Sequence, residues 1–326
     1  MKTEILTILK ENDGFVSGQD LCSRLKVSRT AVWKVIRQLQ EEGYQIEAVR
    51  NKGYRLLQTP DVMTAAEIGS RLHTRLIGKK LVYYDETDST NIQGAKLARE
   101  GCPDGTVVVA DSQTAGKGRR GRNWSSPHGS SIYISFVLRP DIPPACASSI
   151  TLIAGMAAAE AIKAETGILA GIKWPNDVVI NGKKVCGILT EMNAEVEAIH
   201  YIVSGIGINV NQQEFPEEIR ETATSLKLEG KKEVNRSSLA AKLAESFERF
   251  YEIFLQTGDL SQLKDLYEGM LVNLGRQVKV LDPKGDYQGI CRGINIEGEL
   301  LVECPGGDLR QVRSGEVSVR GVYGYV

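Results

Sequence analysis

The chain has 326 residues, of which 42% are hydrophobic and 25% are charged, the composition of an ordinary folded globular protein. A chain of this length accommodates about two to three domains. Its 40 Lys and Arg residues nearly balance its 41 Asp and Glu residues, which gives a net charge of −1. Attraction of the whole molecule to nucleic acid is therefore excluded, and any site for a polyanion must be local.

The pattern of apolar residues and cysteines excludes several further classes of protein. No apolar run approaches the roughly 18 residues of a membrane span, and the start of the chain is amphipathic with acidic residues, unlike a signal peptide. The six cysteines and three histidines are scattered without a C-x-x-C motif, so neither a zinc site nor a disulfide framework is expected. These features predict reduced thiols in a cytoplasmic protein that uses no membrane.

The first sixty residues predict a winged helix-turn-helix domain. Apolar residues recur at helical spacing over residues 2–12, 17–27 and 29–42. Residues 44–49 and 53–57 then alternate like the two strands of a hairpin. Three helices followed by a hairpin is the pattern of this DNA-binding domain, and the alternative is a small packing domain with the same elements.

Charge placement favours DNA binding. Between Met1 and Gln58, ten Lys and Arg residues outnumber seven Asp and Glu residues, a balance of +3 in a chain that totals −1. The excess lies on the third helix, which would be the recognition helix, and on the hairpin wing, whose cations suit phosphate contacts. The residues expected to contact DNA are Ser28, Arg29, Thr30, Lys34, Arg37, Arg50 and Lys52. Trp33 is expected to pack inside the domain rather than to stack on bases.

A polar segment is expected at the start of the central domain, which follows a linker around Pro60. A strand over residues 80–85 is followed by Ser89-Thr90-Asn91, which opens a helix that runs to about Glu100. Hydroxyls and an amide at a helix N-terminus suit a polar small molecule. Plain N-capping is the alternative.

A glycine-rich cationic loop lies between two apolar strands, residues 106–111 and 131–138. It runs from Gln113 to Trp124, and its segment Gly116–Arg122 holds three glycines and four cations. Glycines let a backbone approach a ligand closely, and clustered cations favour a polyanion such as a phosphate chain. The alternative is a solvated, flexible basic loop.

Two further motifs follow the long helix expected over residues 147–165. In Lys173-Trp174-Pro175-Asn176-Asp177, a cation for phosphate and a carboxylate for Mg²⁺ suit a nucleotide, and a surface ion pair is the alternative. A hairpin with an Asn181-Gly182 turn carries Lys184 and Gly187. The glycines of Gly205-Ile206-Gly207-Ile208-Asn209 permit close approach to a flat ligand.

The C-terminal part predicts two amphipathic helices, residues 235–254 and 260–271, and then five short strands. The strands are expected over residues 277–281, 287–295, 299–303, 309–313 and 317–320. Five short strands in about fifty residues are typical of a small SH3-like barrel. It carries no catalytic constellation, so a lid or docking role is expected. The chain is thus an α+β multidomain protein, with domains expected at residues 1–60, 61–272 and 273–326.

Together these blocks resemble those of biotin–protein ligases, in the same order. The matching blocks are Ser89-Thr90-Asn91, Gln113 with Gly116–Arg122, Lys173–Asp177, Lys184 with Gly187, and Gly205–Asn209. With the winged helix, the chain resembles, over its whole length, the bifunctional ligases that also repress the biotin operon. Lys117 departs from the family pattern, which often has arginine there, so the charge is kept without the planar guanidinium.

The resemblance implies a central mixed α/β sheet of the class II synthetase and biotin–lipoate ligase type, and a reaction in two steps. Biotin and ATP, with Mg²⁺, would form biotinyl-5′-adenylate and pyrophosphate, and a lysine of biotin carboxyl carrier protein would then take the biotin. It implies biotin contacts from Ser89, Thr90, Asn91, Gln113, Gly116, Lys117, Gly118, Arg119, Lys184 and Gly187. It implies nucleotide contacts from Arg119, Arg122, Lys173, Asn176 and Asn209, catalysis by Lys184 and Arg119, and a Mg²⁺ ligand in Asp177.

The resemblance also implies that the adenylate-bound form becomes a homodimer that binds operator DNA. Two other functions remain open at this stage. One is a transcription factor whose central domain senses a small molecule without reacting, which the cationic loop disfavours. The other is a ligase for lipoate or octanoate on the same fold, which would not usually carry a winged helix.

Overall fold

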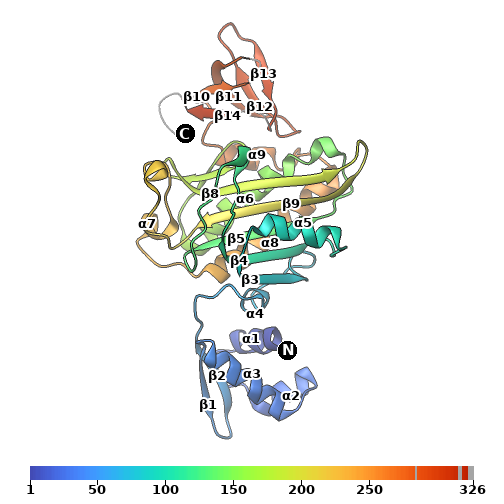
Figure 1. Cartoon of the computed structure of the whole chain (residues 1–326), viewed down its shortest axis with the longest axis vertical. Coiled ribbons are helices and arrows are strands. Elements are labelled where there is room, and N and C mark those ends of the chain that lie inside the picture. The colour runs from blue at the N-terminus through green and yellow to red at the C-terminus, as the bar shows by residue number, and fades with distance from the viewer. Residues whose placement is uncertain (283–284, 315–317, 322–326) are drawn as a thin grey trace.

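The computed structural model describes residues 1–282, 285–314 and 318–321. Three units follow one another along the long axis of the molecule (Figure 1). The N-terminal helices and hairpin lie at one end, a large sheet with helices occupies the middle, and a small sheet from the C-terminal part lies at the other end.

The N-terminal unit has the expected three helices and hairpin. They are α1 (Lys2–Lys10), α2 (Gly18–Leu25), α3 (Arg29–Glu41), β1 (Gln45–Val49) and β2 (Gly53–Gln58). The side chains of Ser17 and Ser28 cap α2 and α3, accepting from Asp20 N at 3.0 Å and Ala31 N at 3.2 Å. These caps satisfy amide groups that have no partner within a helix, which is why both helices begin where they do.

The expectation for Trp33 is wrong, because its side chain is 53% exposed. The inward face of α3 is formed by Val32, Val35, Ile36 and Leu39, which recur at helical spacing and are buried. Trp33 lies next to that stripe but points away from it. The strong apolar character of tryptophan misled the sequence interpretation, whereas the helical period would have placed it outside.

A short helix, α4 (Ala65–Gly69), connects this unit to the rest of the protein. Its Glu67 is fully buried and accepts hydrogen bonds from Lys10 Nζ at 2.7 Å and Tyr44 Oη at 2.8 Å. A buried carboxylate requires such partners. These bonds tie the winged helix to the central part of the chain.

The central unit is a mixed sheet of seven strands in the order β3-β4-β5-β9-β8-β7-β6. The strands are β3 (Leu81–Thr87), β4 (Thr106–Gln113), β5 (Ser131–Leu138), β6 (Gly171–Lys173), β7 (Asp177–Ile180), β8 (Lys183–Ala194) and β9 (Ile199–Asn209). Only β3 and β4 run parallel, and every other neighbouring pair is antiparallel. As expected from its uninterrupted apolar run, β4 is buried on both faces.

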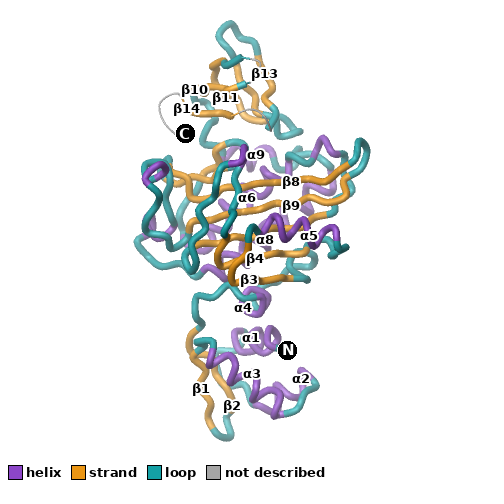
Figure 2. Tube along the Cα trace, in the orientation of Figure 1, coloured by secondary structure: helices purple, strands orange, loops and turns teal. Residues whose placement is uncertain are grey.

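Helices cover both faces of this sheet (Figure 2). The long helices α6 (Ser149–Thr166) and α8 (Arg236–Thr257) pack on the face formed by Ile132, Ile134 and Phe136 of β5. The shorter α5 (Thr90–Arg99) packs on the opposite face, against Val137 and its neighbours. The alternation of side chains along β5 therefore separates the hydrophobic core from the face on which α5 begins.

The segment Pro144–Thr166, which includes α6, is long and apolar enough to cross a membrane by length and composition alone. However, 72% of its most apolar window is buried inside the protein. Its apolar side chains face the sheet and α8, so packing accounts for them. The remaining helices are α7 (Leu226–Gly230) and α9 (Lys264–Met270), the latter shorter than the helix expected over residues 260–271.

The C-terminal unit is an antiparallel sheet in the order β13-β12-β11-β10-β14. Its strands are β10 (Gln277–Leu281), β11 (Tyr287–Ile294), β12 (Leu300–Glu303), β13 (Leu309–Val312) and β14 (Ser318–Gly321). The five expected strands are confirmed, although Val317, where the last was expected to begin, lies outside the described residues. Trp174 holds this unit to the central sheet: its Nε1 donates to Gly298 O and its N to Asn273 Oδ1, both at 3.0 Å.

Candidate ligand-binding site

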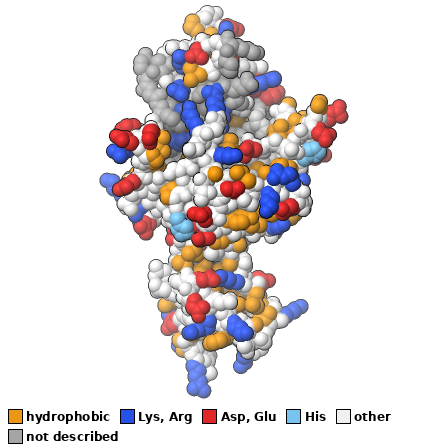
Figure 3. Space-filling model, viewed as in Figure 1, with side chains coloured by type: hydrophobic (Ala, Val, Ile, Leu, Met, Phe, Trp, Pro, Cys, Tyr) orange, Lys and Arg blue, Asp and Glu red, His pale blue; other side chains and the backbone are white. Residues whose placement is uncertain are grey.

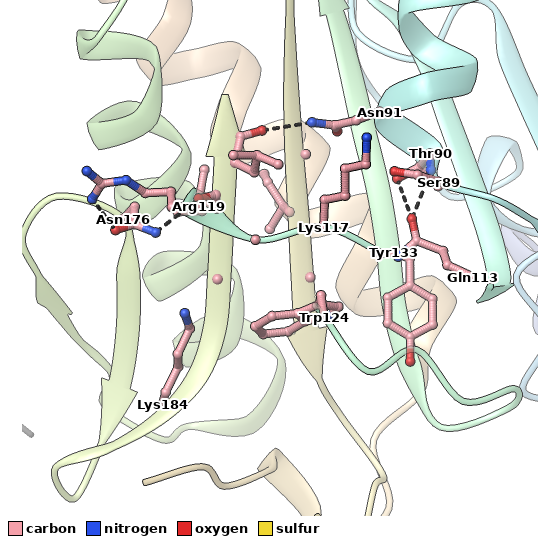
Figure 4. Close-up of a pocket in the computed structure, with 17 residues that line it drawn as sticks. Ser89, Thr90, Asn91, Gln113, Lys117, Arg119, Trp124, Tyr133, Asn176 and Lys184 are labelled. Atoms are coloured by element: carbon pink, nitrogen blue, oxygen red, sulfur yellow. Dashed lines mark hydrogen bonds between the residues drawn. The ribbon is translucent and has the colours of Figure 1, made fainter. Parts of the chain in front are cut away.

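A small cavity lies on the α5 face of the central sheet, beneath the glycine-rich loop (Figure 4). In the sheet register, Gly205 of β9 lies opposite both Ser135 of β5 and Leu189 of β8. Gly207 likewise lies opposite Tyr133 and Gly187. Three glycines on adjacent strands leave a hollow in a surface that is otherwise covered by side chains.

One side of the cavity is a network of polar groups around Thr90. Gln113 Oε1 accepts from Thr90 N at 2.8 Å and from Thr90 Oγ1 at 3.2 Å, while Gln113 Nε2 donates to Ser126 Oγ at 2.9 Å. Ser135 Oγ lies 2.8 Å from Thr90 Oγ1 and 2.7 Å from Asn91 Oδ1. These contacts fix the orientation of the donors and acceptors before any ligand arrives, which favours specific binding.

Trp124 lies over the glycine floor. A Cβ atom added at Gly187 or Gly207 would lie 2.7 Å or 2.6 Å from its indole ring, so both glycines are required by this packing. Trp124 Nε1 is buried and has no hydrogen-bond partner in the described part of the chain. The cavity that remains is only about 50 Å³, whereas small-molecule sites usually span roughly 300 Å³ or more. A ligand of that size therefore enters only when Trp124 moves with its loop.

The other side of the cavity is cationic. Lys184 Nζ lies 2.6 Å from Asp177 Oδ1 and 5.3 Å from the centre of the Trp124 ring. Arg119 Nη1 donates to Asn176 Oδ1 at 3.0 Å, and Asn176 Nδ2 donates to Ile188 O at 3.1 Å. Burial lowers the pKa of Arg119, and the neighbouring Asp177 partly offsets this effect.

Lys173 adds a buried cation next to this group, with only 6% of its surface exposed. Burial lowers its pKa to about 8, and Asp177 acts in the opposite direction. Lys184, Arg320 and Arg122 lower the pKa further by repulsion. A cluster of cations that destabilise one another is favourable for binding an anion, because the anion relieves the repulsion.

A larger cleft of about 570 Å³ adjoins the cavity. It is lined by the outer part of the glycine-rich loop, by the segment 173–177, and by residues 212–223. Phe215 and Ile219 supply apolar surface, and Val319 and Arg320 reach it from β14 of the C-terminal unit. The cleft thus lies between the central and C-terminal units, where ligand sites are common.

The structure brings almost all of the site residues expected from the sequence to these two hollows. The expected residues that line the small cavity are Ser89, Thr90, Asn91, Gln113, Lys117, Gly118, Arg119, Asn176, Lys184 and Gly187. The residues that line the larger cleft include Arg122, Lys173, Asn176, Asp177 and Asn209. Gly116 lines neither; a Cβ there would lie 2.5 Å from Trp124 O, so this glycine serves the packing of the loop. Asn209 Nδ2 is occupied by Thr224 O at 3.0 Å.

Several lining residues were not found by the sequence interpretation. Tyr133 lines the small cavity, and Ser135 bonds Thr90 and Asn91 beside it. Both lie within a strand that reads as apolar, and only the pairing of β5 with β9 places them opposite the glycines. Arg320 lies about two hundred residues along the chain from the motifs. Trp124 offered a signal, because it ends the cationic loop and a tryptophan there is unusual among turn residues.

A second candidate surface lies on the N-terminal unit, where Lys and Arg side chains gather at the lower tip of the molecule (Figure 3). The side chains of Arg29, Thr30, Lys34 and Arg37 on α3, and of Arg50 and Lys52 on the wing, are exposed. Arg29 Nη2 donates to Gln19 Oε1 at 2.8 Å, and Ser28 Oγ is used as the cap of α3. The expected DNA contacts are therefore exposed.

The sequence matches three family models. Residues 2–55 match an HTH domain, residues 83–209 match the biotin/lipoate A/B protein ligase family, and residues 274–320 match the biotin protein ligase C terminal domain. The fold and the site thus define a biotin ligase joined to a DNA-binding domain.

Two similar proteins are named as both a ligase and a repressor. The bifunctional ligase/repressor BirA of Bacillus subtilis is 41% identical over 94% of each chain, and that of Escherichia coli is 32% identical over 97% of this chain and 96% of its own. The structure of biotin protein ligase from Aquifex aeolicus in complex with biotin and ATP is 34% identical, with a TM-score of 0.66 over 74% of this chain and 99% of that chain. The chain belongs to the family of bifunctional biotin ligase/repressors, as its motifs predicted.

Proposed function

We propose that the small cavity binds biotin, that the larger cleft binds ATP, and that the two react at the junction. The observation that carries this proposal is that Arg119, Asn176 and Lys184 line both hollows, so the biotin carboxylate and the α-phosphate would meet among them. A carboxylate oxygen of biotin attacks the α-phosphorus, the bond to the β-phosphate breaks, and pyrophosphate leaves. The acceptor lysine then attacks the acyl carbon, and AMP leaves with the electron pair.

Arg119 and Lys184 would stabilise the charge that develops on the phosphates, and Lys173 and Arg122 would bind the departing pyrophosphate. Ser89, Thr90, Asn91, Gln113 and Gly187 would shape and orient the biotin ring, with Gly118 and Lys117 closing over it. Closure of the loop would exclude water from the adenylate, which water would otherwise hydrolyse.

Mg²⁺ fits the cleft as an ion held mainly by the phosphates of ATP. Among the described residues that line the cleft, Asp177 and Glu218 carry carboxylates, and Asp177 lies beside the cationic group. Mg²⁺ in nucleotide sites usually has one or two carboxylate ligands, and phosphates and water supply the rest. Asp177 is the residue we assign to it, and the ion would supply charge neutralisation.

Exchange of labelled pyrophosphate into ATP in the presence of biotin tests the enzymatic proposal. Arg119→Ala and Lys184→Ala should each reduce the exchange by two or more orders of magnitude, as loss of a charge-stabilising group does. Arg75→Ala, which removes an exposed arginine paired with Glu252 far from the site, is the control. Normal exchange in both site variants would rule out the roles assigned to Arg119 and Lys184. Exchange that is supported by lipoate in place of biotin would indicate a lipoate ligase instead.

For the repressor activity, we propose that the adenylate-bound protein forms a homodimer whose α3 helices and wings bind operator DNA, and that biotin carboxyl carrier protein is the acceptor. All six cysteines are free, in keeping with a cytoplasmic protein. Operator affinity, measured with and without biotin plus ATP, tests the regulatory proposal. Equal affinity in both conditions would rule it out, while the ligase could still be active.

A further inference from the structure

Arg236 is the first residue of α8. It connects Asp61, in the linker that follows the winged helix, to Asp111, which lies just before the glycine-rich loop. Its side chain is almost fully buried, and Nη1 donates to Asp111 Oδ1 at 2.6 Å. Its Nε and backbone N donate to the two oxygens of Asp61 at 2.8 Å and 2.9 Å, and Nη2 donates to Asp61 O at 3.0 Å. One buried guanidinium is thus shared between two carboxylates from different parts of the chain.

Asp111 holds the segment that follows the glycine-rich loop to the strand that precedes the loop. It lies on β4, two residues before Gln113, and its second oxygen accepts from Gly129 N at 3.0 Å. His128 Nε2 lies 2.8 Å from the same oxygen. The strand before the loop and the segment after it therefore meet at a carboxylate whose other oxygen is bound to Arg236, so a rearrangement of the loop would change the geometry of that ion pair.

The opposite side of this group contacts the winged helix. Asp61 belongs to the segment that follows the wing strand β2. Ser237, the neighbour of Arg236, donates to Glu67 Oε1 at 3.3 Å, and Glu67 also binds Lys10 of α1 and Tyr44. The N-terminus of α8 thus contacts Asp111, just before the glycine-rich loop, and also Asp61 and Glu67 in the segment that follows the winged helix.

We propose that Arg236 is the positioning residue that couples the ligand loop to the winged helix. This inference rests on the proposed function, because it concerns how ligand binding changes operator affinity. A buried charge that loses one partner is strongly destabilised unless its other partners compensate. Ordering of the loop over the adenylate therefore alters the Asp111 contact, and Arg236 transmits the change to Asp61 and the linker. By linkage, bound operator must then tighten ligand binding by the same factor.

Asp61→Asn tests this coupling without touching the ligand site. The substitution keeps an oxygen that accepts hydrogen bonds but removes the charge on the linker side. The matched control is Glu252→Gln. Glu252 lies on α8, as Arg236 does, and pairs with Arg75. Its side chain is 36% exposed, as that of Asp61 is. Both variants are full-length proteins, and thermal melting verifies that they fold.

The measurement is the affinity for a duplex that the wild-type protein selects from a random pool in the presence of biotin and ATP. The quantity compared is the ratio of affinities with and without biotin plus ATP. We expect Asp61→Asn to reduce this ratio about fivefold or more, with unchanged pyrophosphate exchange, and Glu252→Gln to leave both unchanged. An unchanged ratio, or equal weakening in both conditions, would overturn the inference. If the wild-type ratio is one, the proposed regulation itself fails.

A second, independent observation concerns Trp33. Its exposed ring lies between Thr30 and Arg37 on the outer face of α3, where Lys34 is its neighbour, and Arg37 Cζ lies 5.8 Å from the ring centre. An exposed tryptophan flanked by cations is complementary to DNA, because the cations attract the phosphates while the ring covers apolar base edges. The thymine 5-methyl group is the apolar feature of the major groove. We propose that Trp33 reads a thymine methyl in each half-site.

Replacing each thymine of the selected duplex in turn by deoxyuridine removes one methyl group at a time. For the wild-type protein, replacement at one position in each half-site should lower the affinity about three- to fivefold. Trp33→Ala should bind more weakly overall and show no loss at that position. The control is Leu57→Ala, an exposed apolar residue of the wing strand. Equal losses in wild type and Trp33→Ala, or altered dimerisation without DNA, would overturn the assignment.

Discussion

Lys184 Nζ and Asp177 Oδ1 are 2.6 Å apart, across the two strands of the hairpin that the Asn181-Gly182 turn connects. The pair is partly buried and lines the cleft. Phosphate would compete with Asp177 for Lys184, and the displaced carboxylate would then be available to Mg²⁺. In the proposed reaction, the hairpin would hold both charges next to the phosphates.

Asp177→Asn should raise the Mg²⁺ concentration that gives half-maximal pyrophosphate exchange, because an amide is a weaker ligand for this ion than a carboxylate. The activity at saturating Mg²⁺ should fall less than in Lys184→Ala. Titration of Mg²⁺ at fixed ATP provides the measurement. If activity falls with no change in the Mg²⁺ midpoint, Asp177 only positions Lys184 and does not bind the ion.

ATP binding should depend on pH through Lys173, whose pKa is lowered to about 8 by burial. The protonated lysine binds phosphate, so ATP affinity should fall as pH rises through about 8, and binding above that pH should take up a proton. Calorimetry in two buffers of different ionisation enthalpy measures this uptake. Lys173→Arg, which stays charged, should abolish both effects. Undiminished uptake in that variant would assign the proton to another group.

Gly207→Ala should weaken biotin binding about tenfold or more, because its Cβ would lie 2.6 Å from the Trp124 ring and would fill the floor of the cavity. Trp124 fluorescence during biotin titration measures this effect and the movement of the ring. Gly269→Ala, where an added Cβ meets no atom within 4 Å, is the control for a glycine substitution. Equal biotin affinity in both variants would contradict a ring site on this floor.

Arg320→Ala should raise the KM for ATP about tenfold with little change in the KM for biotin, because Arg320 lines only the larger cleft. Removal of one phosphate-facing charge has an effect of this order. Arg310→Ala alters an exposed arginine on β13 of the same sheet and should behave as wild type. A rise in both KM values would instead indicate that the C-terminal unit has moved as a whole.

The elements that carry the site were predictable because their signals are local. Helical periodicity, serine caps and the Asn181-Gly182 turn depend on residues within one or two turns of each other. The cationic loop and Lys173–Asp177 were recognisable for the same reason: closely spaced charges and glycines have few structural explanations. The helix observed as α9 is shorter than the one expected over residues 260–271, because tertiary contacts rather than propensity end such short helices.

By itself, the sequence determined the order of the three units, their element types and the motifs of a biotin ligase with a winged helix. The tertiary structure decided which residues complete the site, because contacts such as Gly207 with Trp124 and Arg320 with the cleft join positions far apart in the chain. It also buried Arg236 between two carboxylates. Burial and long-range pairing are properties of the packed molecule, so no local pattern could specify them.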